Sequence, residues 1–278
     1  MKKDRKWSTF VLLLVFFIGL SVMLYPTISS YWNSKTQSEA IVDYEKMLDN
    51  LPKEDYSKVF SETEEYNRRL ADLDFPLIEY PDAGDYAKTL DITSTGMMGY
   101  LTIDVIGLEL PIYHGTGDDV LSHAVGHLEG TSFPVGGESV HTVVSAHRGL
   151  PTAVLFTNLD HLELGDTFTV TVLDRTLTYQ VDNIVTVDPT DTSNLLIEQG
   201  SDYCTLLTCT PYGINTHRLL VRGVRIETVQ QKTIYITGDA HRIEPLIVTP
   251  IVALPILFTL MMIVLFKPVQ KDDLGDDV

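Results

Sequence analysis

The pattern of apolar and polar positions divides the chain into a helical region followed by a strand-rich region. Residues 26–73 are predicted to be helical, because apolar side chains recur at helical spacing from about residue 36 and Pro52 interrupts them once. From residue 97 the pattern changes to short β-branched and aromatic runs separated by glycine and proline. These runs predict strands at residues 100–103, 108–113, 140–146, 167–172, 176–187, 203–209 and 219–226. Several short strands between turns predict a barrel or sandwich, so the expected fold class is mostly β.

Helical spacing is sparse within the β domain, which is predicted over residues 97–230. Short helices are expected at residues 118–124, 153–159 and 193–199. Residues 74–96 contain Pro76, Pro81 and Gly84 without a clear period, and they are predicted to form a loop.

Two uncharged apolar runs, Trp7 to Tyr25 and Leu246 to Phe266, lie outside this core. Twenty or so apolar residues at about 1.5 Å rise span a hydrocarbon layer roughly 30 Å thick. The second run therefore predicts a transmembrane helix over residues 246–266, since prolines are tolerated in membrane helices. Residues 1–25 fit either an uncleaved membrane anchor or a cleaved signal peptide, because basic residues precede the run and no clear cleavage site follows it.

The distribution of basic residues predicts the orientation of these segments. Lysine and arginine lie before the first apolar run and lysines follow the second, so both ends are expected to face the cytoplasm. Residues 26–244 would then face outward, with residues 231–245 as a linker and residues 267–278 as a short cytoplasmic tail. The expected location is the cell membrane, with the β domain extracellular.

The charge of the chain narrows its possible partners. A formal net charge of −18 argues against nucleic acid, because phosphate binding needs clustered lysine and arginine. Such a charge suits a surface exposed to solvent outside a cell.

Only two cysteines are present, Cys204 and Cys209. On one extended strand, an offset of five residues places them on opposite faces and roughly 16 Å apart. A disulfide needs Cα atoms within about 7 Å, so the two are not expected to pair. We interpret Cys204 as a small core residue.

Three chemically active side chains stand at predicted strand ends. Cys209 ends one strand, His147 follows another, and Arg218 begins the next strand after the cysteine. A lone cysteine is more often a core residue than a nucleophile, and a lone arginine is more often part of a surface ion pair. Together, a thiol, an imidazole that can transfer protons and a permanently charged guanidinium are the parts of a covalent acyl-transfer site.

The segments around these residues are similar to those of the sortase family, and within it to the pilus-assembling class C. Residues 205–209 read TLLTC and match the family motif TLxTC, and TPYGINTHRL at residues 210–219 resembles its continuation through the arginine. SAHRGLP at residues 145–151 is similar to the segment that supplies the family histidine. GHLEGTSFPVGG at residues 126–137 resembles a class C segment. The resemblance covers about residues 97–227, and the order of the three motifs makes it specific.

The resemblance implies a fold, a reaction and partners. The fold would be an eight-stranded β-barrel, and the enzyme a cysteine transpeptidase without cofactor or metal ion. Cys209 would attack the Thr–Gly bond of an LPxTG-like sorting signal and hold a pilin subunit as a thioester. His147 would protonate the departing amine, and Arg218 would stabilise the oxyanion. A lysine amine of the next pilin would then resolve the thioester into an isopeptide bond.

One departure from class C concerns a lid over the site. Class C enzymes commonly carry a lid loop with an Asp-Pro-aromatic anchor that contacts the cysteine. No such triplet occurs in residues 74–96, and the pair Asp188-Pro189 lies elsewhere and is followed by Thr190. We therefore expect either no lid or an atypical one in residues 74–96.

Other functions remain as alternatives. Within the family, the enzyme could attach surface proteins to cell-wall peptide instead of to pilin lysines. A papain-like protease is disfavoured, because its cysteine precedes its histidine. A metal-binding surface protein is the remote alternative, since His123 and His127 are four residues apart and three more histidines lie nearby. Gly126 argues against a helix there, so His127 is interpreted as a structural hydrogen-bonding residue.

Overall fold

The computed structural model describes residues 2–49, 51–228 and 258–259. The chain divides into two units, residues 29–232 and residues 1–28 with 233–278. The strands and the helices that pack on them lie in the first unit. The predicted linker at 231–245, the tail at 267–278 and nearly all of the predicted C-terminal span at 246–266 lie outside the described residues.

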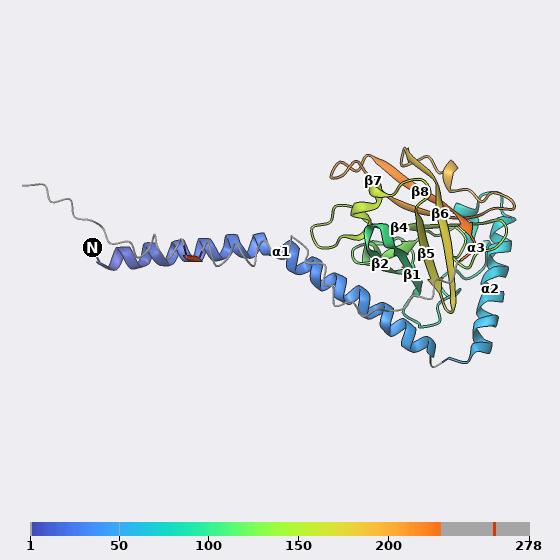
Figure 1. Ribbon diagram of the computed structural model, residues 1–278, viewed down its shortest axis with the longest axis horizontal. Coiled ribbons are helices and arrows are strands. Elements are labelled where there is room, and N and C mark those ends of the chain that lie inside the picture. The colour runs from blue at the N-terminus through green and yellow to red at the C-terminus, as the bar shows by residue number, and fades with distance from the viewer. Residues whose placement is uncertain (1, 50, 229–257, 260–278) are drawn as a thin grey trace, which may run out of the picture. The chain divides into compact units, whose positions relative to one another are not determined.

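Eight strands close into a barrel in the order β1-β2-β3-β4-β7-β8-β6-β5, which confirms the expected fold class (Figure 1). The strands are β1 (Met97–Ile103), β2 (Leu108–His114), β3 (Val125–His127), β4 (Val140–Ser145), β5 (Thr167–Val172), β6 (Arg175–Val187), β7 (Asp202–Thr210) and β8 (His217–Ile226). Two of the pairings, β2 with β3 and β4 with β7, are parallel, and the other six are antiparallel. Closure gives every strand a paired neighbour on both sides.

Strand β3 was not predicted, because three residues are too few to show an alternating pattern. Its central glycine is required by packing, since a Cβ at Gly126 would lie 2.2 Å from the carbonyl oxygen of Gly115. The glycine that argues against a helix at this position therefore belongs to a short strand.

The helical region contains α1 (Lys2–Asp49) and α2 (Lys53–Ala71), which are separated at Pro52 as the pattern indicates. Within residues 29–49 of α1, Ile41, Tyr44 and Leu48 are buried at helical spacing. The Tyr44 hydroxyl donates to the carbonyl of Met98 at 3.1 Å and accepts from the backbone amide of Leu173 at 3.0 Å. This part of α1 is thus attached to the barrel by both apolar and polar contacts.

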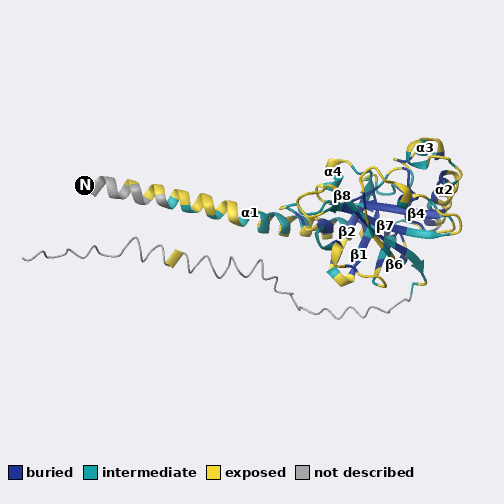
Figure 2. Cartoon of the chain, turned by 90° about the horizontal axis from the view of Figure 1, so that it is seen from above, coloured by how far each residue is buried: buried dark blue, intermediate teal, exposed yellow. Residues whose placement is uncertain are grey.

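The first part of α1, before residue 29, exposes apolar side chains instead of burying them. From Phe10 to Met23 its large apolar side chains are mostly exposed (Figure 2). Among the described residues, one helical segment, Leu13–Asp49, is long and apolar enough to cross a membrane. This agrees with an anchor or signal near the N-terminus.

Residues 74–96, expected to be a loop, contain the helix α3 (Pro76–Ala83). Pro76 stands in the first turn, where its missing N–H has no intrahelical partner to lose. The Glu79 carboxylate accepts from the backbone amide of Phe75 at 3.0 Å, which caps the same end. Pro76, one of the prolines that indicated a loop, is therefore compatible with this short helix.

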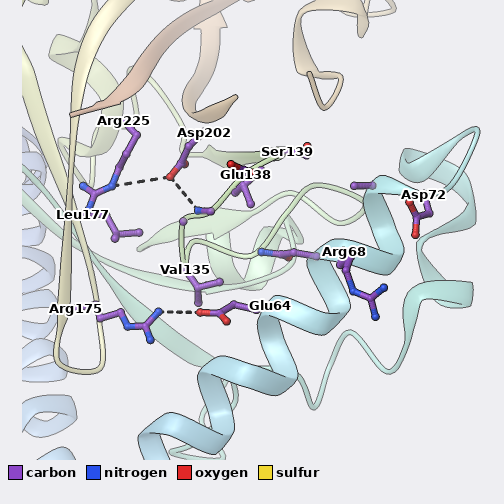
Figure 3. A pocket seen from close by; sticks show the side chains of 15 residues that line it. Glu64, Arg68, Asp72, Val135, Glu138, Ser139, Arg175, Leu177, Asp202 and Arg225 are labelled. Atoms are coloured by element: carbon purple, nitrogen blue, oxygen red, sulfur yellow. Dashed lines mark hydrogen bonds and ion pairs between the residues drawn. The ribbon is translucent and has the colours of Figure 1, made fainter. Parts of the chain in front are cut away.

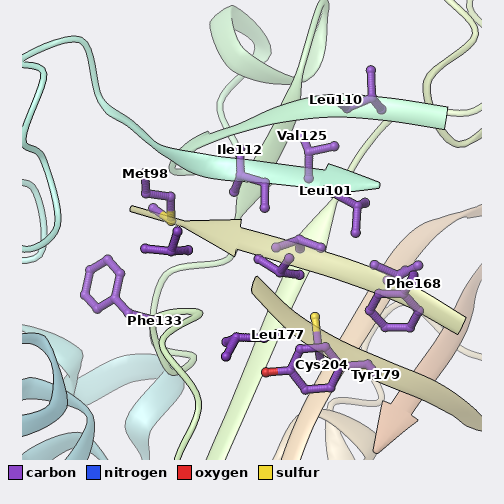
Figure 4. Packing of buried hydrophobic residues seen from close by; sticks show 14 of the residues in the cluster. Met98, Leu101, Leu110, Ile112, Val125, Phe133, Phe168, Leu177, Tyr179 and Cys204 are labelled. Atoms are coloured by element: carbon purple, nitrogen blue, oxygen red, sulfur yellow. The ribbon is translucent and has the colours of Figure 1, made fainter. Parts of the chain in front are cut away.

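The remaining helices are short, as expected: α4 (Asp118–Leu121) and the 3₁₀ turns η1 (Asp104–Ile106), η2 (Leu155–His161) and η3 (Ser193–Leu195). The barrel interior is filled by aliphatic and aromatic side chains from most of the strands, and Cys204 is packed among them (Figure 4). Helix α2 is fastened to this core by Asn67, whose side-chain amide pairs with both the carbonyl and the amide of Phe133, at 3.0 and 2.8 Å.

His127 is fully buried beside this helix–barrel contact. Its ring stacks on Phe133, with centroids 5.1 Å apart, and its Nε2 lies 2.9 Å from the carbonyl oxygen of Ser132. The Tyr86 hydroxyl lies 3.0 Å from the other ring nitrogen. The carbonyl can only accept, so Nε2 carries the proton of a neutral ring. These hydrogen bonds confirm the interpretation of His127 as a structural hydrogen-bonding residue. Burial lowers the pKa of His127 to about 4.

This buried histidine predicts a loss of stability in acid. The folded-state pKa of about 4 lies below the ordinary value of 6.5, so the unfolded chain binds the proton more readily between these pH values. The free energy of unfolding should fall as the pH is lowered through this window, by about 3 kcal/mol in total. Denaturant titrations of the full chain at pH 7 and pH 4 measure the change. In His127→Gln, the difference in the free energy of unfolding between pH 7 and pH 4 should be smaller by a similar amount. In His161→Gln, at an exposed site, this difference should persist. An equal difference in both variants would contradict the role of His127 in acid sensitivity.

Candidate active site

The pairing of three strands brings His147, Cys209 and Arg218 to one end of the barrel. Strands β4 and β7 run parallel with Ser145 opposite Leu207, and His147 and Cys209 each lie two residues further along. Strands β7 and β8 run antiparallel with Cys209 opposite Arg218. All three side chains line a single cavity of about 380 Å³. Cys209 and Arg218, which follow His147 by 62 and 71 positions in the sequence, therefore lie near it in space.

The backbone around His147 is held on both sides. Thr208 donates its buried hydroxyl to the carbonyl of Ala146 at 2.8 Å, and the amide of Ala146 donates to the carbonyl of Leu207 at 3.2 Å. On the other side, the amide of Phe156 in η2 donates to the carbonyl of His147 at 3.1 Å. One threonine of the TLxTC motif thus fastens the histidine segment directly to the strand that carries the cysteine.

The two cysteines have opposite environments, and neither forms a disulfide. Cys204 is fully buried in the barrel interior, and this burial raises the pKa of its thiol well above the ordinary value. Cys209 is partly exposed to the cavity. A buried thiol of raised pKa is a poor nucleophile, so the geometry favours Cys209 as the reactive one.

Arg148 joins the two strand ends that carry the histidine and the cysteine. Its guanidinium forms an ion pair with Asp160, lies 3.4 Å from the hydroxyl of Thr210, and stands 5.9 Å from the centre of the Tyr212 ring. The arginine side chain is only 8% exposed, although the aspartate is 42% exposed. Arg148 is not among the predicted site residues, because an arginine next to a histidine does not by itself indicate a contact with a strand 62 residues away.

The lining of this cavity is largely apolar, and part of it comes from the loop between β6 and β7. The apolar lining residues are Leu121, Leu128, Ala146, Val187, Pro189, Leu195, Leu207 and Leu220. The loop contributes Pro189, Asp191, Thr192 and Leu195. Nothing in the local pattern of residues 188–195 indicated that they would reach Cys209, since only the chain path over the sheet brings them there.

Residues 74–96, considered as an atypical lid, do not line this cavity. They lie against another part of the barrel, where the Tyr80 hydroxyl contacts Glu129 at 3.3 Å and the Tyr86 hydroxyl contacts His127 at 3.0 Å. A Cβ at Gly130 would lie 2.5 Å from the Cα of Leu77, so α3 touches the β3–β4 loop closely. In this structure the segment is therefore fixed away from the thiol.

A larger cavity of about 780 Å³ lies between α2, the β3–β4 loop and the barrel, and contains none of the three candidate site residues (Figure 3). It includes Asp202, which begins β7, whereas Cys209 stands near the other end of that strand. Four of its charged side chains form two ion pairs: Arg175 with Glu64 at 2.9 Å, and Arg225 with Asp202 at 3.9 Å. We place the candidate chemistry in the smaller cavity, because it contains the thiol.

Three of the histidines considered as metal ligands are bonded to protein carbonyls. His114 contacts the carbonyls of Gly96 and Thr89, and His141 contacts that of Leu196 at 2.7 Å. His127 contacts that of Ser132. Across residues 2–49, 51–228 and 258–259, no three histidine, cysteine or acidic side chains are grouped to hold a metal ion.

The arrangement at the strand ends suits covalent acyl transfer through a thiol, with a proton-transfer group and a fixed cation beside it. Comparison with known proteins agrees with this class. The sortase domain model matches residues 101–226. The chain is 45% identical to the sortase C of Streptococcus pneumoniae over 68% of its own length and 97% of that chain, with a TM-score of 0.61.

Two further sortases also match this chain. The sortase C of Clostridium perfringens, solved with the C-terminal cell wall sorting motif, is 41% identical over 68% of this chain and 99% of its own, with a TM-score of 0.61. Sortase D of Bacillus subtilis (strain 168) is 31% identical over 131 residues, which span 46% of this chain and 63% of that relative. The chain belongs to the sortase family of cysteine transpeptidases, and to its class C.

Proposed function

We propose that this chain joins pilin subunits covalently, with Cys209 as nucleophile, His147 as general acid and base, and Arg218 as stabiliser of the oxyanion. The observation that carries the proposal is that the three side chains line one cavity together with several apolar side chains. The sortase C of Streptococcus pneumoniae has been described in terms of pilin substrate specificity, which supports the same substrate class.

In the first half-reaction the Cys209 thiolate attacks the carbonyl carbon of the threonine in an LPxTG-like sorting signal. A C–S bond forms, and the carbonyl oxygen becomes an oxyanion beside the Arg218 guanidinium. The C–N bond to glycine then breaks, and His147 gives a proton to the departing amine. The pilin remains attached to the enzyme as a thioester.

In the second half-reaction a lysine amine of another pilin subunit attacks the thioester. The amine gives a proton to His147, a C–N bond forms and the thiolate leaves. The product is an isopeptide bond between subunits. The apolar part of the cavity lining, which includes Leu207 and Leu220, suits the leucine and proline of the sorting signal, since burial of apolar surface favours their binding.

The proposed location is the cell membrane, with the barrel outside the cell. Support comes from α1, whose first part exposes a continuous series of apolar side chains. The low content of basic residues, with a net charge of −18, leaves nucleic acid outside the proposed partners.

Pilin polymerisation predicts a ladder of covalent products. The full chain in detergent micelles, incubated with a pilin subunit carrying an LPxTG signal, should form multimers that resist boiling in denaturant. Replacing the acceptor lysines of the pilin by arginine should remove the ladder while cleavage of the sorting signal continues. Cleavage without any ladder from the unmodified pilin would contradict polymerisation and favour attachment to cell-wall peptide. A parallel reaction with a cell-wall peptide amine measures that alternative.

A further inference from the structure

The loop between β6 and β7, residues 188–201, lies over the outer face of β4, β7 and β8. Leu195 of this loop is buried in a small apolar cluster with Val143, Val187 and Leu220, and Leu207 packs against the cluster. The same leucine lines the cavity that contains Cys209. The position of this loop therefore decides the shape of one cavity wall.

His141 on β4 connects this loop to the barrel. The side chain is almost fully buried, and its Nδ1 lies 2.7 Å from the carbonyl oxygen of Leu196, the residue after Leu195. Its Nε2 lies 2.8 Å from the hydroxyl oxygen of Thr205. His141 thus stands between the first threonine of the TLxTC motif and the loop.

The hydrogen-bond chemistry of the ring defines the direction of both contacts. A carbonyl oxygen can only accept, so Nδ1 carries the proton. A neutral ring then accepts at Nε2, and the Thr205 hydroxyl donates to it. Burial lowers the pKa of His141, which is consistent with a neutral ring. The Thr205 hydroxyl therefore favours the tautomer of His141 with the proton on Nδ1, and this proton is donated to the carbonyl of Leu196.

Other hydrogen bonds reach this loop near its β7 end. The amide of Val140 donates to the carbonyl of Ser201 at 2.9 Å, the amide of Gly200 donates to the Ser139 hydroxyl at 3.0 Å, and Tyr203 and Arg222 contact the Glu198 carboxylate at 3.4 and 3.5 Å. None of these bonds reaches Pro189, Asp191, Thr192 or Leu195, the loop residues that line the cavity. The buried bond to Leu196 is closer to this part of the loop, and a lost buried hydrogen bond costs more than an exposed one.

We propose that His141 is a positioning residue that shapes the sorting-signal cavity by holding the β6–β7 loop, with Thr205 holding His141 in turn. The proposal rests on the proposed function, because it assumes that the cavity at Cys209 receives the sorting signal. His141 touches none of the reacting atoms, so its loss should weaken peptide binding and leave the reactivity of Cys209 unchanged. A merely structural role would instead lower the amount of folded enzyme without changing KM.

The test compares variants of the full chain in detergent. His141→Ala removes both hydrogen bonds, and His141→Asn can still donate to Leu196 from nearly the position of Nδ1. In His141→Ala, KM for an LPxTG peptide should rise about tenfold with kcat changed by less than about twofold. Amide hydrogen exchange in residues 189–197 should become faster, and His141→Asn should restore most of both effects. Labelling of Cys209 by a small methanethiosulfonate reagent should keep the wild-type rate.

A second pair of variants covers the case in which His141→Ala does not fold. Thr205→Val keeps the side-chain shape and removes the hydroxyl, and Thr205→Ser keeps the hydroxyl. Faster exchange of the loop in Thr205→Val but not in Thr205→Ser supports the proposal. Unchanged loop exchange in Thr205→Val, or a fall in kcat without a change in KM, would overturn it. If the wild type cleaves no LPxTG peptide, the proposed function fails, while the exchange measurements still decide whether His141 holds the loop.

Discussion

Cys209→Ala is expected to abolish thioester formation and to lower cleavage of an LPxTG peptide by more than about a thousandfold. The reason is that the substitution removes the atom that forms the covalent bond, and the other cysteine cannot replace it. Cys204 lies in the barrel interior, on the opposite face of β7, where burial raises the pKa of its thiol. Mass spectrometry of the enzyme after quenching with acid should show the acyl adduct in the wild type and not in the variant.

Cys204→Ala is the matched control, since it removes a thiol from the same strand. It should keep most of the activity and still form the adduct, although the small cavity left in the core should lower the melting temperature. Loss of the adduct in Cys204→Ala with retention in Cys209→Ala would show that the two cysteines have been assigned the wrong way round.

His147→Ala is expected to lower amide cleavage by about a hundredfold to ten-thousandfold, the usual range for a general acid. The amine that leaves the sorting signal is a poor leaving group without a proton. A matching ester substrate, whose alkoxide leaves more easily, should be affected much less. Rates of both substrates with the full chain measure the difference, and His161→Ala provides a control at an exposed histidine. An equal loss on the ester and the amide would contradict the role of His147 as proton donor.

The geometry explains why His147→Ala should not disturb the position of Cys209. Thr208 donates to the carbonyl that precedes His147, so the backbone of the histidine segment is attached to β7 independently of the imidazole. Phe156 of η2 holds the carbonyl of His147 itself. Removal of the ring should therefore leave Cys209 in place, and its labelling by a small thiol reagent should continue.

Several elements could be predicted because their patterns are local. Seven of the eight strands are β-rich runs between turn residues that are long enough to be recognised, whereas β3 has three residues and a central glycine that packs against Gly115. Residues 74–96 were expected to be a loop because of their prolines, yet Pro76 begins the helix α3. In both cases the error came from a short segment whose conformation is decided by its contacts.

The sequence could not decide whether residues 74–96 form a lid over Cys209. The absence of an Asp-Pro-aromatic triplet indicated that residues 74–96 would not cover the thiol in the usual way. In the structure, the contacts of Tyr80 and Tyr86 hold this segment near Glu129 and His127. The wall beside Cys209 comes instead from residues 189–195, for which the sequence contains no motif.

The sequence by itself determined the family, the strand-rich domain and the three strand ends that carry His147, Cys209 and Arg218. These features depend on side chains that are near one another along the chain. Only the tertiary structure decided the parallel register of β4 and β7, the burial of Cys204 and the path of the β6–β7 loop over the sheet. The bond between Thr208 and Ala146, for example, joins residues 62 positions apart. Such contacts depend on how the whole barrel closes, because their partners come together only when every intervening strand is in place.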